Sequence, residues 1–76
     1  MTIREVFAAN LRAARQEAGL SQEALAHDAG VDRTYISALE RGVYAASIVM
    51  VDKLAKVLKT DASTLLQKPS ARRRKT

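Results

Sequence analysis

The fold of this chain is decided by residues 21–42, which read SQEALAHDAGVDRTYISALERG. Two short helices that meet at a wide angle need a small side chain where they cross, and Ala26 supplies it. The turn between them needs a residue that tolerates positive φ, and Gly30 does so at no steric cost. Ser21 and Asp32 carry oxygens that can cap the two helices. A glycine after a helix is by itself an ordinary C-cap, but these residues at these offsets together predict a helix-turn-helix.

The second of these two helices has an apolar side and a polar side. With the preceding helix and the turn, its inward side is predicted to form a buried seam of Leu25, Val31, Ile36 and Leu39. The side chains left outside are Arg33, Thr34, Ser37 and Ala38. Short side chains and one guanidinium suit the edges of bases in the major groove of double-stranded DNA, and they are out of place on a core-facing stripe. We therefore predict that the helix beginning near Asp32 reads DNA sequence.

Capping patterns and helical spacing predict a long helix before this unit. Thr2 and Glu5 are spaced as a capping box, in which a hydroxyl and a carboxylate satisfy free backbone N–H groups reciprocally. Apolar residues then recur at helical spacing from Val6 to Ala18, and Gly19 ends the pattern.

Two further helices are predicted after the unit. Ser47 can cap a helix whose inward stripe consists of Ile48, Val51, Leu54, Ala55 and Leu58. The β-branched run at residues 48–51 is also compatible with a strand, but the period continues to Leu58 and favours a helix. A short fifth helix is predicted to begin at Thr60 or Asp61 and to include Leu65 and Leu66. The chain is thus predicted to be all-α, a compact five-helix bundle with the helix-turn-helix at its centre.

The excess positive charge of the chain lies at its C-terminal end. The net charge is +5, but five of the 13 basic residues follow the last apolar run: Lys68, Arg72, Arg73, Arg74 and Lys75. The other eight balance the eight acidic residues, so the net charge says little about a basic binding face. We expect residues 1–67 to form one helix-turn-helix DNA-binding domain and residues 68–76 to form a basic, flexible tail.

The composition argues against several other classes of protein. There is no cysteine and only one histidine, His27, so neither a disulfide framework nor a histidine-based metal cluster is expected. No glycine-rich phosphate loop is present, no cofactor is expected, and the sequence argues against an enzyme. No apolar run reaches the ~20 residues of a membrane span, and the N-terminus lacks the pattern of a signal peptide, so we expect a cytoplasmic protein. A core this small is also expected to leave no room for an effector pocket.

Over roughly residues 5–67 the sequence resembles the repressor/Cro-type (XRE) helix-turn-helix family. The matching features are Arg15, Gly19-Leu20-Ser21-Gln22, Leu25-Ala26, Gly30-Val31, Ile36-Ser37, Leu39-Glu40-Arg41-Gly42 and Leu54-Ala55-Lys56-Val57-Leu58. Within the family, residues 32–37 are most similar to the controller proteins of restriction–modification systems, which are small dimeric transcriptional regulators. Tyr44-Ala45-Ala46 departs from the pattern, since relatives more often carry basic or Asn/Pro residues there, and this departure leaves the phosphate contacts of that loop open.

The resemblance implies roles for individual side chains. Base edges would be faced by Arg33, Thr34 and Ser37, with Ala38 on the same predicted outer surface. Phosphate contacts would come from Gln22, Tyr35 and Arg41. Tyr35 is equally compatible with an aromatic ring that braces the helix or touches a thymine methyl, and Arg41 with a simple surface charge. Arg15 and Glu40 match a pair that is expected to bridge the first and third helices, which is a structural role.

Surplus apolar residues near the C-terminus predict a homodimer. Met50 and Val57 lie off the inward stripe of their helix, and Leu65 and Leu66 cannot easily both face inward. We therefore predict a two-fold interface formed by Met50, Val57, Leu65 and Leu66 on the last two helices, which is also where the resemblance places it. The competing interpretation is that these are ordinary scattered surface residues.

These observations predict a homodimeric, sequence-specific regulator of transcription whose partner is an approximately palindromic operator in double-stranded DNA. The alternative is a protein–protein regulator, such as an antitoxin or an anti-activator, that uses the same fold with weak or no DNA binding. The electrically neutral body of the chain keeps that alternative open.

Overall fold

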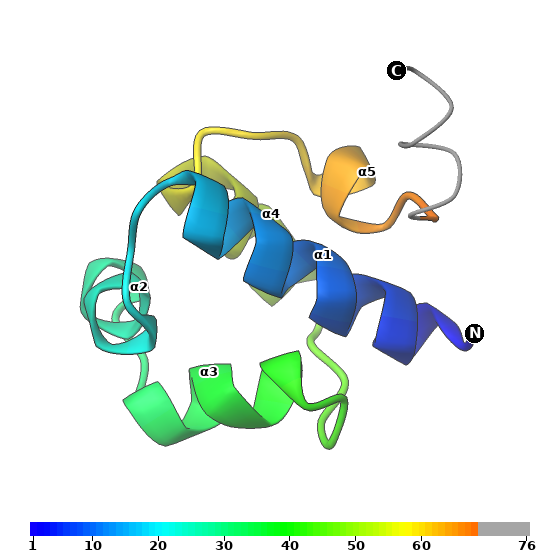
Figure 1. Ribbon diagram of the computed structural model, residues 1–76, viewed down its shortest axis with the longest axis horizontal. Helices are drawn as coiled ribbons and strands as arrows, with labels where there is room; N and C mark the ends of the chain where they lie inside the picture. Colours follow the sequence, from blue (N-terminus) through cyan, green and yellow to red (C-terminus); the bar gives the residue numbers. More distant parts are fainter. Residues whose placement is uncertain (69–76) are drawn as a thin grey trace.

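The computed structural model describes residues 1–68, and over this range the chain forms five helices. They are α1 (Ile3–Glu17), α2 (Gln22–Ala29), α3 (Arg33–Glu40), α4 (Ile48–Val57) and α5 (Ala62–Leu65). Figure 1 shows α1 crossing in front of the fainter α4, with α2 at the left, α3 along the bottom and α5 at the upper right. The predicted all-α bundle with a central helix-turn-helix is confirmed. Of the tail predicted over residues 68–76, all but Lys68 lies outside the described residues.

Side-chain caps start four of the five helices, as the sequence predicts. The hydroxyl or carboxylate oxygens of Thr2, Ser21, Asp32 and Ser47 accept hydrogen bonds from backbone N–H groups in the first turns of α1 to α4. At α1 the capping box is complete, because the Thr2 N–H donates to Glu5 Oε1 at 2.8 Å and Thr2 Oγ1 accepts from the Glu5 N–H at 3.2 Å. The backbone hydrogen bond from Thr2 favours the charged carboxylate and so lowers the pKa of Glu5.

Each of α1 to α4 is followed by a residue in the left-handed conformation. After α2 this residue is Gly30, at φ +71°, and the next N–H, of Val31, donates to the Ala26 carbonyl at 2.9 Å. This closed turn sets the angle between α2 and α3. After α4 the same turn is formed without glycine: Lys59 has φ 58°, and the Thr60 N–H donates to the Ala55 carbonyl at 2.9 Å.

The core forms where the inner faces of α1 to α5 meet. Its members are Phe7, Leu11, Leu25, Ala26, Ala29, Ile36, Leu39, Val51, Leu54, Ala55, Leu58 and Leu65. Most residues of the predicted apolar stripes belong to this core. Ile48 does not, because it is 83% exposed, so its prediction as part of the α4 stripe is wrong. The reason is positional, because Ile48 is in the first turn of α4 and the core begins one turn later, at Val51. Ala18, predicted at the end of the α1 stripe, is also exposed.

A buried amide holds α5 against α1. Asn10 lies inside the bundle, and its Nδ2 donates to the carbonyl oxygens of Leu65 at 2.9 Å and of Gln67 at 2.6 Å. The Leu65 carbonyl belongs to the last residue of a four-residue helix, whose last C=O groups have no partner within the helix, and the Gln67 carbonyl lies just after it. A short helix with few residues in the core is thereby fixed in place by α1.

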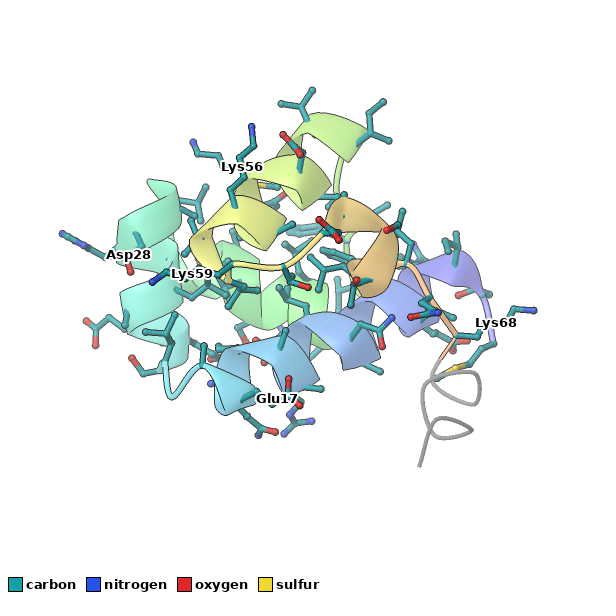
Figure 2. The ribbon with its side chains drawn as sticks, turned by 90° about the horizontal axis from the view of Figure 1, so that it is seen from above. Glu17, Asp28, Lys56, Lys59 and Lys68 are labelled. Atoms are coloured by element: carbon teal, nitrogen blue, oxygen red, sulfur yellow. The ribbon has the colours of Figure 1, made fainter. Side chains whose placement is uncertain are left out.

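Apart from the Arg15–Glu40 pair described below, the charged residues among residues 1–68 are exposed. Figure 2 shows Asp28, Lys56 and Lys59 projecting outward from α2, from α4 and from the end of α4. Lys56 Nζ pairs with Asp52 Oδ2 one turn earlier at 3.1 Å, an exposed pair of small energetic value. Within residues 1–68, no helix is both long and apolar enough to cross a membrane.

Candidate DNA-binding surface

The helix α3 lies at the edge of the molecule, with α2 at its start and the α3–α4 loop at its end (Figure 1). Its inner side is covered by the core through Ile36 and Leu39, which are fully buried. Asp32 caps the first turn, and its Oδ1 accepts from the Thr34 N–H at 3.2 Å. The helix is therefore rigidly seated with its other side open to solvent.

A nearly buried ion pair fixes α3 to α1. Arg15 Nε donates to Glu40 Oε2 at 2.6 Å and Arg15 Nη2 donates to Oε1 at 3.1 Å, with the two side chains only 12% and 4% exposed. Arg15 Nη1 also donates to the Leu20 carbonyl at 2.8 Å. The hydrogen bonds to Glu40 raise the pKa of Arg15, because they stabilise the charged guanidinium. The predicted bridge between the first and third helices is thus present, and it also holds the loop before α2.

Gln22 joins this network from the first turn of α2. Its Nε2 donates to Glu40 Oε1 at 3.1 Å. An amide nitrogen has two hydrogens, so one donor of Gln22 is still available for a second partner. The sequence predicts Gln22 as a phosphate contact but gives no sign of its link to Glu40. This link places the side chain beside the C-terminal part of α3.

Four side chains share the outward face of α3. A helix turns about 100° per residue, so residues 33, 34, 37 and 41 fall on one side of it. Arg33, Thr34 and Arg41 are exposed and Ser37 is half-buried. Two guanidinium groups and two residues with hydroxyls therefore share a single helix face, a composition that suits base edges and adjacent phosphates.

The prediction that Ala38 belongs to this face is wrong. Its side chain is only 5% exposed in the structure. Ala38 lies on the flank of α3 where the following loop folds back, and the Val43 N–H donates to the Ala38 carbonyl at 3.0 Å. A methyl group in that position packs against the protein and is not available to a base.

The same flank of α3 bears a pair of aromatic rings. Tyr35 is half-buried and packs against the core, and its ring centroid lies 6.4 Å from that of Tyr44 in the α3–α4 loop, with an interplanar angle of 32°. The sequence predicts Tyr35 as a backbone contact or a brace, and its packing fits the brace at least. The sequence marks Tyr44 only as a departure from the family pattern, because no sequence spacing relates a loop residue to a ring one helix earlier.

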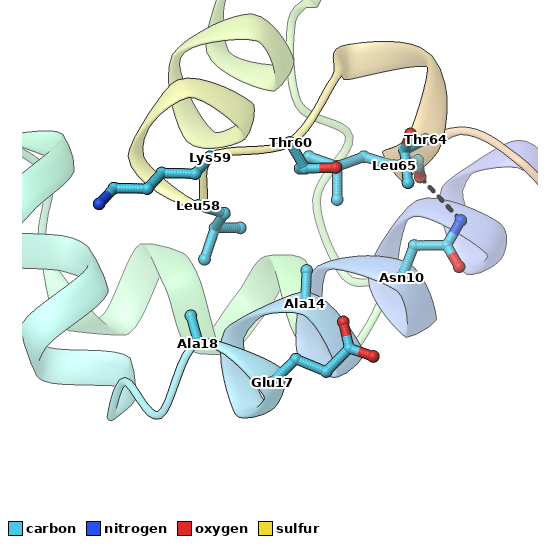
Figure 3. A pocket seen from close by; sticks show the side chains of 9 residues that line it. All are labelled: Asn10, Ala14, Glu17, Ala18, Leu58, Lys59, Thr60, Thr64 and Leu65. Atoms are coloured by element: carbon cyan, nitrogen blue, oxygen red, sulfur yellow. Dashed lines mark hydrogen bonds between the residues drawn. The ribbon is translucent and has the colours of Figure 1, made fainter.

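Two hollows accompany the helices. One, of about 480 Å³, lies between α1 and the end of α3, and it brings Arg12 and Gln16 near Arg41. Arg12 was not predicted, since only the fold relates it to α3. The other, of about 260 Å³, lies between α1 and the α4–α5 segment (Figure 3). Its volume is below the roughly 300 Å³ at which ligand pockets usually begin. In Figure 3 the Asn10 amide is directed to the Leu65 carbonyl, and the Lys59 ammonium points away from the hollow.

Exposed apolar side chains lie at the N-terminus, in the α3–α4 loop, at the start of α4 and after α5. Ile48 and Val49, in the first turn of α4, are 83% and 73% exposed. Leu66 is exposed too, and it lines a small apolar groove of about 80 Å³ with Ile3 and Val51. Among the predicted interface residues, Met50 and Val57 are half-buried against the core.

Leu65 does not belong to an exposed interface. It is 1% exposed and sits in the core, so its prediction as an interface residue is wrong. Because α5 is a single short turn, only one of two consecutive leucines can face the bundle, and the structure turns Leu65 inward and Leu66 outward.

Comparison with known proteins supports the same fold. The model of the helix-turn-helix family HTH_3 matches residues 11–65. A hypothetical transcription factor of Neisseria meningitidis serogroup B is 41% identical over 70 residues, which cover 92% of this chain and 66% of that protein. Control protein C.SmaI of Serratia marcescens is 41% identical over 66 residues, covering 87% of this chain and 79% of the relative. This match confirms the predicted likeness to controller proteins.

Solved structures agree with these matches. The crystal structure of hypothetical transcription factor NHTF from Neisseria superposes with a TM-score of 0.93 at 39% identity, covering 99% of this chain and 86% of the other. The biofilm regulator SinR, solved in complex with DNA, gives a TM-score of 0.76 at 34% identity, covering 80% of this chain and 98% of SinR. The chain therefore belongs to the XRE-type helix-turn-helix family, which is a family of DNA-binding regulators of transcription.

Proposed function

We propose that this chain is a homodimeric regulator of transcription that recognises an approximately palindromic operator in double-stranded DNA. The observation that carries the proposal is the outward face of α3, where Arg33, Thr34 and Ser37 lie together while Arg15 and Glu40 clamp the helix from behind. A related regulator has been solved with DNA, and other relatives are named as transcription factors or control proteins.

Each side chain of this face has a distinct role in the proposal. The planar fork of Arg33 donates two hydrogen bonds to O6 and N7 of a guanine, and the hydroxyls of Thr34 and Ser37 contact neighbouring base edges. The phosphate contacts are Arg41, Tyr35 and the second amide hydrogen of Gln22. Gln22 is the first residue of α2, so the free N–H groups of that helix end also attract the phosphate.

The dimer interface is centred on the exposed apolar residues at the start of α4. Its main members are Ile48, Val49 and Leu66, because Leu65 is buried in the core. Met50 and Val57 are half-buried and contribute only their exposed atoms. Burying two such patches against each other removes apolar surface from water in a chain whose own core is small. Two-fold symmetry then sets the two α3 helices about 34 Å apart, one turn of DNA, and this spacing requires a palindromic site.

A competition binding experiment tests this function. The protein is titrated against a duplex from the upstream region of its own gene, with a scrambled duplex of the same composition as competitor. Preference for the upstream duplex by roughly 10³-fold or more is the expected result, as for specific regulators in general. Equal affinity for both duplexes would contradict the proposal.

The second candidate is a protein–protein regulator, and the neutral charge of residues 1–67 favours it. In that case the protein binds both duplexes weakly, in the range of nonspecific binding at physiological salt, about 10⁻⁴ to 10⁻⁶ M. For the DNA-binding function we propose a cytoplasmic location. We propose no catalytic activity and no cofactor.

A further inference from the structure

Two guanidinium groups without a partner line the hollow between α1 and the end of α3. They belong to Arg12 of α1 and to Arg41, the C-cap residue of α3, and both residues are exposed. Within residues 1–68 neither guanidinium has a hydrogen bond or an ion pair, whereas Arg15, the next basic residue of α1, is paired with Glu40. Like charges on one hollow repel each other, and an anion bound between them removes this repulsion.

The wall that α1 contributes to this hollow is low. At about 100° per residue, Arg12 and Gln16 lie one turn apart on the side of α1 that faces away from the core, and both are exposed. The residues around them in the hollow are alanines, namely Ala8, Ala9 and Ala13. Because a methyl group takes little space, a chain as bulky as a sugar–phosphate backbone can approach α1 within reach of both long side chains.

The carboxylates that line the hollow are already engaged within the protein. Glu40 is paired with Arg15, and Glu5 Oε1 accepts a hydrogen bond from the Thr2 N–H at 2.8 Å. Glu5 also lies about 10 Å along the helix from Arg12. The two arginines are therefore the charges that a ligand would meet, and the ligand that they favour is an anion.

The hollow adjoins the surface that is proposed to bind DNA. Arg41 belongs to both, because it is the last residue on the outward face of α3. Glu40 connects the hollow to Gln22, since its carboxylate lines the hollow and accepts from Gln22 Nε2 at 3.1 Å. A DNA strand that is held by Gln22 therefore runs along the same flank of α3 as the hollow.

We propose that this hollow is a phosphate site, in which Arg12 and Arg41 together bind one phosphodiester group of the operator and Gln16 donates a further hydrogen bond. Guanidinium groups suit this task, because their planar forks match the oxygens of a phosphate and stay charged. The site adds α1 to a DNA-binding surface that is otherwise formed by α2 and α3. The proposal rests on the proposed function, because the phosphate belongs to the strand beside α3.

The first test measures the affinity of Arg12→Gln for the operator and for the scrambled duplex at several salt concentrations. Glutamine keeps a polar chain but removes the charge, so affinity should fall about tenfold or more. The factor should be the same for both duplexes, because a phosphate contact carries no sequence information.

A double variant tests whether the two arginines share one phosphate. Arg12→Gln combined with Arg41→Gln should lose less affinity than the product of the two single losses, because either loss already disrupts a shared site. Its log–log slope of affinity against salt should flatten by about 0.9 per half-site, the value for one phosphate, and not by about 1.8. An uncharged methylphosphonate at one position per half-site should weaken the wild type and leave the double variant unaffected.

Further arms separate a contact from changes in charge, fold or ligand. Arg4→Gln makes the same change on α1 outside the hollow and should bind both duplexes as the wild type does. Ala9→Gln fills the hollow without changing the charge and should weaken binding of both. Thermal melts establish that all variants are folded. The Nε–H NMR signal of Arg12 should shift with stoichiometric operator and not with millimolar inorganic phosphate, whereas a shift with phosphate alone would make the hollow a site for a free anion and refute the backbone contact.

The outcomes separate this inference from the function on which it rests. If Arg12→Gln keeps the wild-type affinity for both duplexes, the site does not exist, whatever the wild type does with its operator. If Arg4→Gln weakens binding as much as Arg12→Gln does, the effect is one of net charge and the site is refuted as well. If the wild type does not distinguish the two duplexes, the proposed function fails, and the scrambled duplex still decides whether Arg12 binds a phosphate.

Discussion

At the scale of single residues, an ion pair and a glycine determine where α3 points. The Arg15–Glu40 pair ties α3 to α1, and Gly30 makes the turn that sets α3 against α2. Both were predicted from the sequence, because the pair belongs to the family pattern and the turn requires positive φ. Tyr44 and Asn10 could not be predicted in the same way, since their partners lie on other elements and no local spacing announces them.

Breaking the Arg15–Glu40 pair on one side should be costly. Arg15→Ala leaves the Glu40 carboxylate, which is 4% exposed, without its cation, so we expect a loss of about 3 kcal/mol in the free energy of unfolding. The double variant Arg15→Met with Glu40→Leu should lose much less, because it leaves no buried charge unpaired. Urea titrations measure all three proteins. Equal losses in the single and double variants would show that the buried charge is not the cause.

Replacing Gly30 should strain the turn. Space does not decide the effect, because a Cβ at Gly30 would meet only Lys53 Nζ, at 3.8 Å. The backbone conformation decides the effect, because φ +71° is strongly disfavoured for a β-branched residue. Gly30→Val should therefore lower the free energy of unfolding by about 1 kcal/mol or more, and Gly30→Asn should lower it less, because asparagine tolerates this conformation. Coincident thermal melts of wild type and Gly30→Val would contradict this account.

At the scale of elements, the sequence predicts where helices begin and end better than which of their faces is covered. The caps lie within the local sequence, and the structure has those of α1 to α4 at the expected residues, whereas the sequence does not predict the left-handed end of α4 at Lys59. Ile48, Ala38 and Leu65 were assigned to the wrong environment. Periodicity gives the side of a helix on which a residue lies, but burial depends on where a neighbouring element starts or stops, and that is decided by the tertiary fold.

The end of α4 offers a test at this scale. Lys59 takes the left-handed conformation that glycine occupies after α1, α2 and α3. That conformation costs an L-residue roughly 1–2 kcal/mol, and part of the gain from glycine is offset by its greater freedom in the unfolded chain. Lys59→Gly should thus stabilise the fold by about 0.5–1 kcal/mol, and Lys59→Ala, which keeps the strain, should change stability little. A less stable Lys59→Gly in urea titrations would mean that the lysine side chain has a role of its own.

At the scale of the whole molecule, the reading face and the apolar patch occupy different regions of the fold. The residues proposed to contact bases, Arg33, Thr34 and Ser37, lie on α3, and the exposed apolar residues Ile48 and Val49 lie at the start of α4. This separation suits a dimer in which both reading helices stay open. The likeness to known controller proteins and the surplus apolar residues predict a dimer from the sequence, and the exposure of Ile48 and Val49 changes the residues that we propose for its interface.

The dimer is tested by placing a charge in the patch. At micromolar concentration the wild type should sediment as a species of twice the chain mass of 8.3 kDa. Ile48→Lys should sediment at the chain mass, because an ammonium cannot be buried unpaired in an apolar interface. Glu23→Lys, which adds positive charge on an exposed position of α2, is the control and should stay dimeric. A wild type that sediments as a single chain would rule out the interface.

The central claim is that α3 reads base sequence, and the direct measurement is the ratio of affinities for operator and scrambled duplexes in Arg33→Ala. Loss of the guanidinium should cost about 1–3 kcal/mol per half-site on the operator, little on the scrambled duplex, and should relax the preference at one base position. Lys56→Ala, which removes one positive charge from α4, is the control and should keep the wild-type ratio. A ratio that is unchanged in Arg33→Ala would contradict the base-reading role of this helix face.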